Sequence, residues 1–178
     1  LTNKNNNGSK NIINAGINAT SQLNAIKKFI ELKEIKRTIF LTPDVAYKNE
    51  IIKAISSSKI KIIENYIYNT DPTQLTKQIE KITEYKKRKQ NLEDEVKRIE
   101  NSNEINKEKL IEKLKKKDTL GDIKFDSVII ADFDESLKSV TTSLLYTDIS
   151  PKEKYLITLN QWFDESLLKE TSSQPLYF

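Results

Sequence analysis

The sequence SVIIA at residues 127–131 is apolar at four of its five positions, so neither face of this segment suits contact with water. Side chains alternate between the two faces of a strand, and a run without polar alternation is typical of a parallel strand buried between helical layers. Three further runs rich in strand-forming residues accompany it, at residues 38–41, 60–63 and 156–159. We therefore predict a parallel sheet that contains these four strands.

Helical segments separate the predicted strands. Apolar residues recur at helical spacing at residues 20–32, and further helices are predicted near residues 45–55, near residues 135–146 and from Asp164 onward. Alternation of strands and helices along a chain indicates an α/β fold. The 178 residues match one ordinary domain, and the apolar end at residues 175–178 leads us to expect a piece of a longer protein.

The segment at residues 72–118 differs from the rest of the chain in its charge. Residues 77–118 contain 14 basic and 10 acidic residues, which accounts for the net charge of +4 of the whole chain. Asp71 followed by Pro72 is a typical helix start, and a narrow apolar stripe follows that is interrupted at residues 101–103. We predict an antiparallel helical hairpin that projects from the α/β domain. Lys and Glu are interleaved in this segment, and the whole chain has only three Arg, which favours a solvated surface; a nucleic-acid partner is therefore not expected.

Composition excludes several kinds of chemistry. The chain contains no Cys and no His, which removes thiol nucleophiles, Ser–His pairs and the commonest transition-metal ligand. Its three glycines form no phosphate-binding loop. Asp132 and Asp134 after a buried strand resemble the first motif of haloacid-dehalogenase-type phosphatases, but the sequence ends too soon to supply the other residues of that chemistry. We predict no enzyme, with no catalytic residue, no metal site and no cofactor.

Polar and aromatic residues follow the predicted strands at their carboxyl ends. Open parallel sheets bind ligands at this edge, and a small molecule held between two lobes would touch it. The aspartates there are also in place to cap the helices that follow. The candidate ligand-cleft residues are Thr42, Asp44, Tyr47, Asp132, Phe133, Asp134, Asn160, Gln161 and Trp162.

Four short segments resemble a known family. They are KDTLG at residues 117–121, FDSVII at residues 125–130, LLY at residues 144–146 and LNQW at residues 159–162. These segments are similar to the second lobe of the penicillin-binding-protein activators, outer-membrane lipoproteins that are also often labelled branched-chain amino-acid transporter components. The resemblance covers roughly residues 11–178, and the charged insertion is similar to that of the alphaproteobacterial members.

The resemblance implies a fold and a function. The fold is an α/β lobe of the type I periplasmic-binding-protein kind at residues 20–178, with residues 72–118 as a helical hairpin insertion and residues 1–19 as a hinge or linker from a preceding lobe. The implied function is non-catalytic and consists of binding a peptidoglycan synthase in the periplasm. Membrane contact is expected only through a lipid anchor upstream, which would hold the full-length protein at the outer membrane.

A second interpretation is a periplasmic solute-binding receptor of branched-chain amino-acid type for an ABC transporter. Receptors of this kind usually carry Tyr-Gly after the first strand of the lobe, whereas here Tyr47 is followed by Lys48. Phe133 and either Asn160 or Gln161 stand where a tyrosine and an acidic residue are expected. A buried ammonium group without its carboxylate costs on the order of several kcal/mol. Weak or no binding of leucine, isoleucine or valine is therefore expected.

Overall fold

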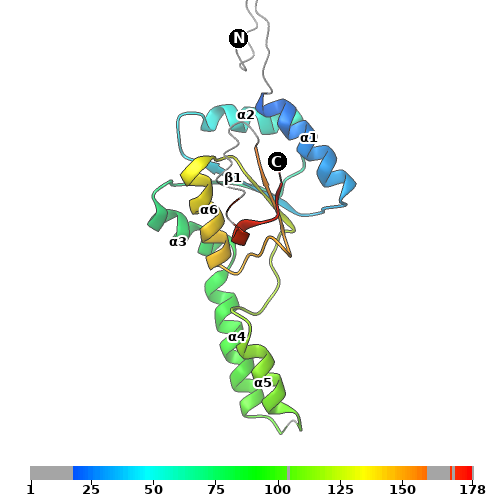
Figure 1. Cartoon of the computed structure of the whole chain (residues 1–178), viewed down its shortest axis with the longest axis vertical. Helices are drawn as coiled ribbons and strands as arrows, with labels where there is room; N and C mark the ends of the chain where they lie inside the picture. Colours follow the sequence, from blue (N-terminus) through cyan, green and yellow to red (C-terminus); the bar gives the residue numbers. More distant parts are fainter. Residues whose placement is uncertain (1–17, 104, 160–168, 170, 178) are drawn as a thin grey trace, which may run out of the picture.

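A single parallel sheet organises the computed structural model, which describes residues 18–103, 105–159, 169 and 171–177 (Figure 1). Within these residues the sheet has the strand order β2-β1-β3-β4-β5, and every neighbouring pair is parallel. The predicted α/β class with a parallel sheet is confirmed. The strands are β1 (Thr38–Pro43), β2 (Glu64–Tyr68), β3 (Ser127–Ile130), β4 (Tyr155–Thr158) and β5 (Leu176–Tyr177), with a short 3₁₀ helix at Thr171–Ser173 before β5.

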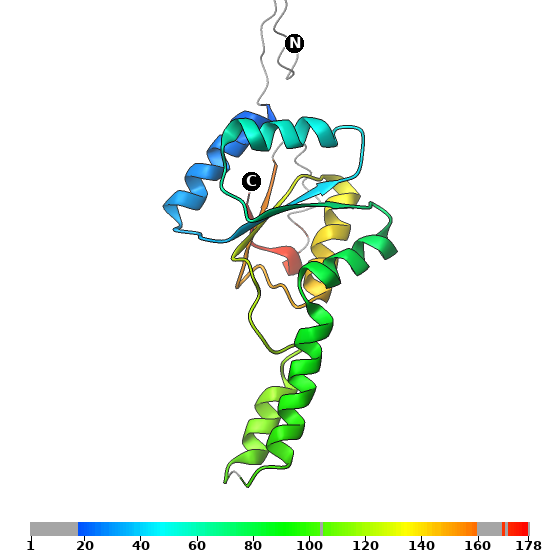
Figure 2. The same ribbon diagram turned by 180° about the vertical axis from the view of Figure 1, so that it is seen from behind.

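Helices cover both faces of the sheet (Figure 2). On one face lie α1 (Ala19–Leu32) and α2 (Lys48–Ser58), and on the other lie α3 (Pro72–Ile82) and α6 (Asp134–Tyr146). The segments that connect β1 to β2, β2 to β3 and β3 to β4 thus all contain a helix, as parallel strands require. None of the described helices is long and apolar enough to cross a membrane.

The strands bury side chains on both of their faces, as their apolar sequences predict. In β1, Ile39 and Leu41 pack with the side chains of α3 and α6, whereas Phe40 packs with those of α1 and α2. The neighbouring β3 repeats this pattern with Val128 and Ile129 on opposite faces. Burying a large apolar side chain contributes about 1.5–3 kcal/mol, and a shift of one residue would exchange the two faces. The two cores therefore fix the register of the central strands.

The strand predicted at residues 60–63 is wrong. The strand at this edge of the sheet is β2, which begins four residues later. Ile60 instead packs with the core beside α2, and the backbone N–H of Ile63 donates to the carbonyl oxygen of Thr38 at 2.7 Å where the chain enters the sheet. Because β2 is an edge strand with mostly half-buried or exposed side chains, its sequence ENYIY lacks the apolar run of the central strands.

A helical hairpin projects from the α/β domain, as predicted. Its two helices are α4 (Tyr85–Glu100) and α5 (Lys107–Lys115), which pack against each other and extend away from the sheet (Figure 1). The projecting part begins at Tyr85 rather than at residue 72. The apolar stripe in the sequence is therefore shared between two different contacts.

The first part of that stripe belongs to the α/β domain. Asp71 caps α3 as predicted, because its carboxylate accepts a hydrogen bond from the backbone N–H of Gln74 at 3.0 Å. Leu75 and Ile79 on α3 lie in the main core, and α3 packs against α6. Glu84 then adopts a left-handed backbone conformation with φ 51°, which ends α3 and turns the chain into α4.

Arg88 holds the base of the hairpin. Only 4% of its side chain is exposed. Its guanidinium donates from Nε to the carbonyl oxygen of Thr83 (2.9 Å), from Nη1 to Oγ1 of Thr119 (2.8 Å) and from Nη2 to the carbonyl oxygen of Thr147 (2.5 Å). A carboxylate oxygen of Asp148 lies 3.9 Å from Nη1. One side chain thus joins the end of α3, the segment that follows α5 and the end of α6.

A second arginine joins the starts of β1 and β3. Arg37 binds Asp126 with three hydrogen bonds: its guanidinium donates to both carboxylate oxygens at 2.7 and 3.2 Å, and its backbone N–H donates at 3.1 Å. These bonds hold the pKa of Asp126 below its usual range. The Arg37–Asp126 pair therefore stabilises the fold only while the aspartate is ionised.

This pair predicts a pH-dependent stability. A carboxyl group with a lowered pKa in the folded state stabilises above the unfolded value of about 3.9, and the contribution is lost as the pH falls through the folded pKa. Asp126→Asn should lower the melting temperature at pH 7, and its difference from the wild type should shrink as the pH falls below the unfolded value and through the lowered folded pKa. Melting curves by circular dichroism test this. Asp122→Asn, an exposed neighbour, is the control, and an equal effect of both variants at pH 7 would contradict the assignment.

Candidate functional site

The strands end at an edge where the winding of the sheet changes direction. From the centre of the sheet, β1 connects outward to β2 on one side, whereas β3 connects outward to β4 on the other. The carboxyl ends of the neighbouring strands β1 and β3 therefore mark a topological switch point. Open parallel sheets place their ligand sites at such a point. Most of the described candidate residues from the sequence lie at this edge, which makes it the candidate functional site.

Asp132 is the centre of this site. It follows β3 directly, and only 5% of its surface is exposed. Oδ2 accepts hydrogen bonds from the hydroxyl of Tyr68 and from Oγ of Ser136 (2.5 Å). Oδ1 accepts from the backbone N–H of Phe133 (2.9 Å) and from the hydroxyl of Tyr47 (3.3 Å). Donors from β2, α6 and the β1–α2 connection thus occupy both carboxylate oxygens.

Two tyrosines and a phenylalanine form the aromatic part of the site. The ring centroids of Tyr47 and Phe133 lie 5.8 Å apart, and both residues are half-buried. Burial, followed by the negative charge of Asp132, raises the pKa of Tyr47 and of Tyr68 well above the ordinary value. Both hydroxyl groups therefore stay protonated at neutral pH and remain donors to the carboxylate.

Three other predicted residues bind partners of their own. Oγ1 of Thr42 donates to Oδ1 of Asn65 at 2.7 Å, which links the last part of β1 to the first part of β2. Asp44 pairs with Nζ of Lys48 at 2.5 Å, and no side chain caps α2. Asp134 is exposed, has a left-handed backbone with φ 50° and does not cap α6. The expectation that Asp44 and Asp134 act as helix caps is therefore wrong.

Asn160, Gln161, Trp162 and the helix expected from Asp164 lie outside the described residues and stay predictions. Two residues of the site, Tyr68 and Ser136, were not among the candidates. Tyr68 was missed because β2 was placed too early in the sequence. Ser136 could have been found, since it stands four residues after Asp132 at the start of a predicted helix, the spacing at which side chains meet.

The buried carboxylate at this edge positions the side chains around it. Asp132 is the first aspartate of the Asp-x-Asp pattern, and both of its carboxylate oxygens accept hydrogen bonds from the chain. A carboxylate that binds a cation instead presents an oxygen to that cation. Among the described residues, no group of three or more carboxylates could hold a metal ion. A fully satisfied buried network of this kind rigidifies its surroundings. The exposed parts of Tyr47 and Phe133 remain for contact with a ligand or a partner.

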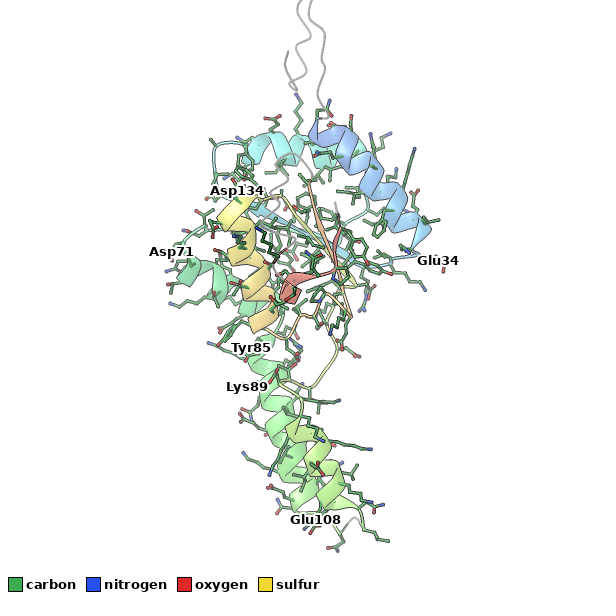
Figure 3. The ribbon with its side chains drawn as sticks, viewed as in Figure 1. Glu34, Asp71, Tyr85, Lys89, Glu108 and Asp134 are labelled. Atoms are coloured by element: carbon green, nitrogen blue, oxygen red, sulfur yellow. The ribbon has the colours of Figure 1, made fainter. Side chains whose placement is uncertain are left out.

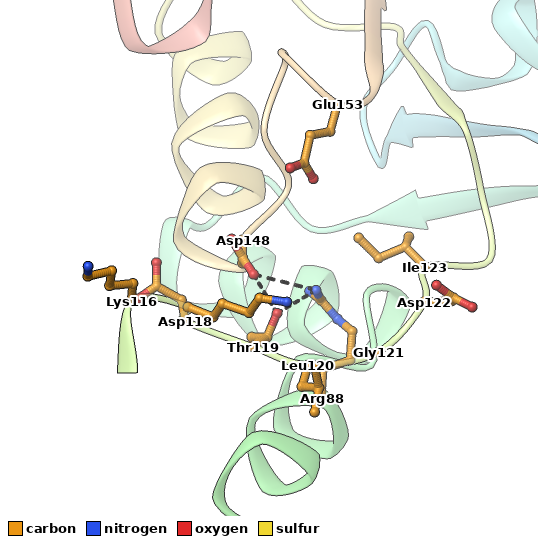
Figure 4. Close-up of a pocket in the computed structure, with 11 residues that line it drawn as sticks. Arg88, Lys116, Asp118, Thr119, Leu120, Gly121, Asp122, Ile123, Asp148 and Glu153 are labelled. Atoms are coloured by element: carbon orange, nitrogen blue, oxygen red, sulfur yellow. Dashed lines mark hydrogen bonds and ion pairs between the residues drawn. The ribbon is translucent and has the colours of Figure 1, made fainter. Parts of the chain in front are cut away.

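A hollow lies at the other end of α6, away from Asp132. Asp134 and Tyr85 mark the opposite ends of this region in Figure 3, and the hollow, of about 600 Å³, lies beside Arg88 at the base of the hairpin (Figure 4). The guanidinium of Arg88 already donates three hydrogen bonds to the chain, so it is not an unpaired charge in the hollow. The charged residues that line it are of both signs: Arg88, Lys116, Lys117, Asp118, Asp122, Asp148 and Glu153.

Two solved structures are among those similar to this chain. No protein-family model matches the chain, and no curated protein matches it. One similar structure is an extracellular ligand-binding receptor from Verminephrobacter eiseniae, with 9% identity and a TM-score of 0.47 over 85% of this chain and 33% of the receptor chain. The other is the complex of the TorS sensor domain with TorT in the absence of ligand, with 9% identity and a TM-score of 0.42 over 86% of this chain. The chain spans a third of the first protein and 40% of the second.

Proposed function

We propose that this chain is one lobe of a non-catalytic, periplasmic-binding-protein-like molecule that acts by binding a protein partner. The observation that carries the proposal is the state of Asp132, whose two oxygens are occupied by four donors of the same lobe. A lobe that uses its central buried carboxylate to hold its own edge together has a rigid surface rather than an open charged pocket.

The carboxylates at this edge argue against a receptor for free amino acids. Such a receptor needs an available carboxylate for the ammonium group, because an unpaired buried charge costs on the order of several kcal/mol. Asp132 is engaged by tyrosine and serine hydroxyls, and Asp44 is paired with Lys48. Asp134 is exposed at the start of α6 rather than enclosed. None of these three is an enclosed carboxylate with a free oxygen.

The proposal extends to the partner and the compartment through the family resemblance. The penicillin-binding-protein activators suggest a peptidoglycan synthase as the partner, the periplasm as the compartment and an outer-membrane lipid anchor upstream of this chain. Residues 1–19 would then form the hinge from a preceding lobe. A solute-binding receptor is the second candidate function, and the half-buried aromatic pair of Tyr47 and Phe133 at the switch point supports it.

Titration calorimetry on the full-length protein separates the two candidates. We expect no heat of binding for leucine, isoleucine or valine, and micromolar binding to the purified peptidoglycan synthase of the same organism. Tyr47→Ala, which removes one ring of the half-buried aromatic pair, is the matched variant for the ligand titration. Micromolar binding of a branched-chain amino acid that is lost in this variant would replace the partner-binding proposal with the receptor. Absence of synthase binding would remove the activator assignment.

A further inference from the structure

The apolar seam between α4 and α5 is incompletely covered. Apart from Arg88, α4 buries only Ile99, and no residue of α5 is buried. A pair of helices normally buries its apolar stripe against a further layer, as in a four-helix bundle. The hairpin extends away from the sheet, so the described part of the domain does not supply that layer (Figure 1). The partly exposed seam residues are Leu92, Val96, Leu110, Ile111 and Leu114.

Charge is distributed unevenly along the hairpin. The base, at residues 85–89 and 110–118, contains eight basic and two acidic residues, a net charge of +6. The distal part, at residues 90–109, contains four basic and six acidic residues, a net charge of −2. Figure 3 shows Lys89 toward the base and Glu108 at the far end. The hairpin therefore carries opposite charges at its two ends.

Four exposed residues repeat this polarity along one side of the seam. Lys86, Lys89, Glu93 and Glu100 are separated by three, four and seven residues, which places them on one side of α4. Lys86 lies 3.7 Å from Glu80, whereas the other three form no ion pair with the described residues. Such charged positions beside an apolar stripe are the ones that select partners and orientation between helices.

We propose that two copies of this chain pair through α4 and α5 in antiparallel orientation to form a four-helix bundle. Twofold symmetry brings the basic base of each hairpin against the acidic distal part of the other, so the favourable contact occurs twice. A parallel pair would instead place net +6 against net +6. The helix length is suitable, because the 16 residues of α4 span about 24 Å, several turns of contact.

Other partners fit this surface less well. An anionic membrane would meet favourable charge only at the base, because the distal part is acidic. An acidic helix from another protein would be repelled over the same distal part. The second copy matches both halves of the charge distribution and also covers the seam. The inference does not depend on the proposed function, since the hairpin and the Asp132 site lie at opposite ends of α6 (Figure 3).

Sedimentation velocity on the 178-residue chain tests the pairing over about 1–100 μM, a range of ordinary affinities. The wild-type chain should dimerise. Glu93→Lys with Glu100→Lys, and separately Lys86→Glu with Lys89→Glu, should each weaken the dimer by about tenfold or more. A chain with all four substitutions has an acidic pair at positions 86 and 89 and a basic pair at positions 93 and 100. Opposite charges meet again in the antiparallel dimer, so this variant should dimerise. Restoration is specific to the antiparallel arrangement, because a parallel pair would still place like charges together.

Controls separate this effect from unfolding and from net charge. Glu31→Lys with Glu34→Lys changes two exposed residues at the end of α1 and adds the same charge as the distal reversal, so this variant should dimerise as the wild type does. Circular dichroism melts show that each variant is folded. A monomer at every concentration, unchanged affinity in both reversals, or a monomeric four-substitution variant would each overturn the proposal. A monomer that binds acidic phospholipid vesicles through Lys86 and Lys89 would assign the surface to a membrane and also overturn it.

Discussion

Replacing Arg88 with alanine is expected to lower the free energy of unfolding by about 3–5 kcal/mol, through lost buried hydrogen bonds and the cavity that remains. The substitution removes the guanidinium that bonds Thr83, Thr119 and Thr147 and leaves their buried acceptors without a donor. It also leaves a cavity where a long side chain was nearly fully enclosed. The hairpin should then lose its fixed attachment to α3 and α6.

Urea unfolding followed by circular dichroism measures this loss. Arg88→Lys is the matched variant, because it keeps the charge but cannot reach three acceptors in three directions, and an intermediate destabilisation is expected. Lys53→Ala changes an exposed residue of α2, away from the hairpin, and should have an effect within about 0.5 kcal/mol. Hydrogen exchange should accelerate at the base of the hairpin in Arg88→Ala before the central strands are affected. An Arg88→Ala protein as stable as the wild type would show that the hairpin is held by other contacts.

Asp132→Ala is expected to destabilise the protein by about 2–4 kcal/mol, since it leaves several buried donors without an acceptor. The largest part comes from the Tyr68 hydroxyl, because Tyr68 is 1% exposed. Tyr68→Phe removes one donor and keeps the acceptor satisfied by Ser136 and Phe133, so its cost should be smaller, about 0.5–1.5 kcal/mol.

A double-mutant cycle over Asp132→Ala and Tyr68→Phe checks this network by urea unfolding. The double variant should be less destabilised than the sum of the single variants, because the unpaired Tyr68 hydroxyl is no longer present. Strict additivity would contradict a bond between the two side chains. A neutral effect of Asp132→Ala would contradict the structural role of this carboxylate and would reopen the receptor interpretation of the site.

The central sheet could be predicted from the sequence because burial on both faces leaves a continuous apolar run. This signal located β1, β3 and β4. It misplaced β2, because Ile60 is buried beside α2 and not in a strand, while the true edge strand is partly polar. An apolar run indicates which residues are buried. At this edge of the sheet the buried residue is Ile60, whereas the strand is formed by residues 64–68.

The end of α3 could not be predicted for a related reason. The apolar stripe continues from Ile79 through Ile82 to Tyr85 at helical spacing, and no Gly or Pro marks the break. The chain turns at Glu84, a residue with no particular preference for the left-handed conformation. Tertiary contacts set this boundary, since Ile79 packs in the main core and Arg88 bonds to Thr83.

The candidate site was predictable in position and less so in its contacts. Strand ends in a parallel sheet meet at one edge, which brought Thr42, Tyr47, Asp132 and Phe133 into the same region from sequence alone. The hydrogen-bond partner of Asp132 in β2 could not be predicted in the same way. The bond of Asp132 to Tyr68 depends on the register of β2 against β1, where Tyr68 stands beside Pro43, and a strand placed four residues early hides that neighbour.

Thr83 and Thr119 both bond to the guanidinium of Arg88, so the chain leaves the α/β domain and returns to it at nearly the same point. Residues 84–118 thus form an insertion whose two ends lie close together and whose described residues contribute no strand to the sheet. Because the entropic cost of closing a loop rises by only about 0.6 kcal/mol for each doubling of its length, the length of this arm is thermodynamically almost free to vary. The part of the arm beyond Arg88 can accordingly differ in length without a change in the strand order, provided that Arg88 and Thr119 still meet at its base.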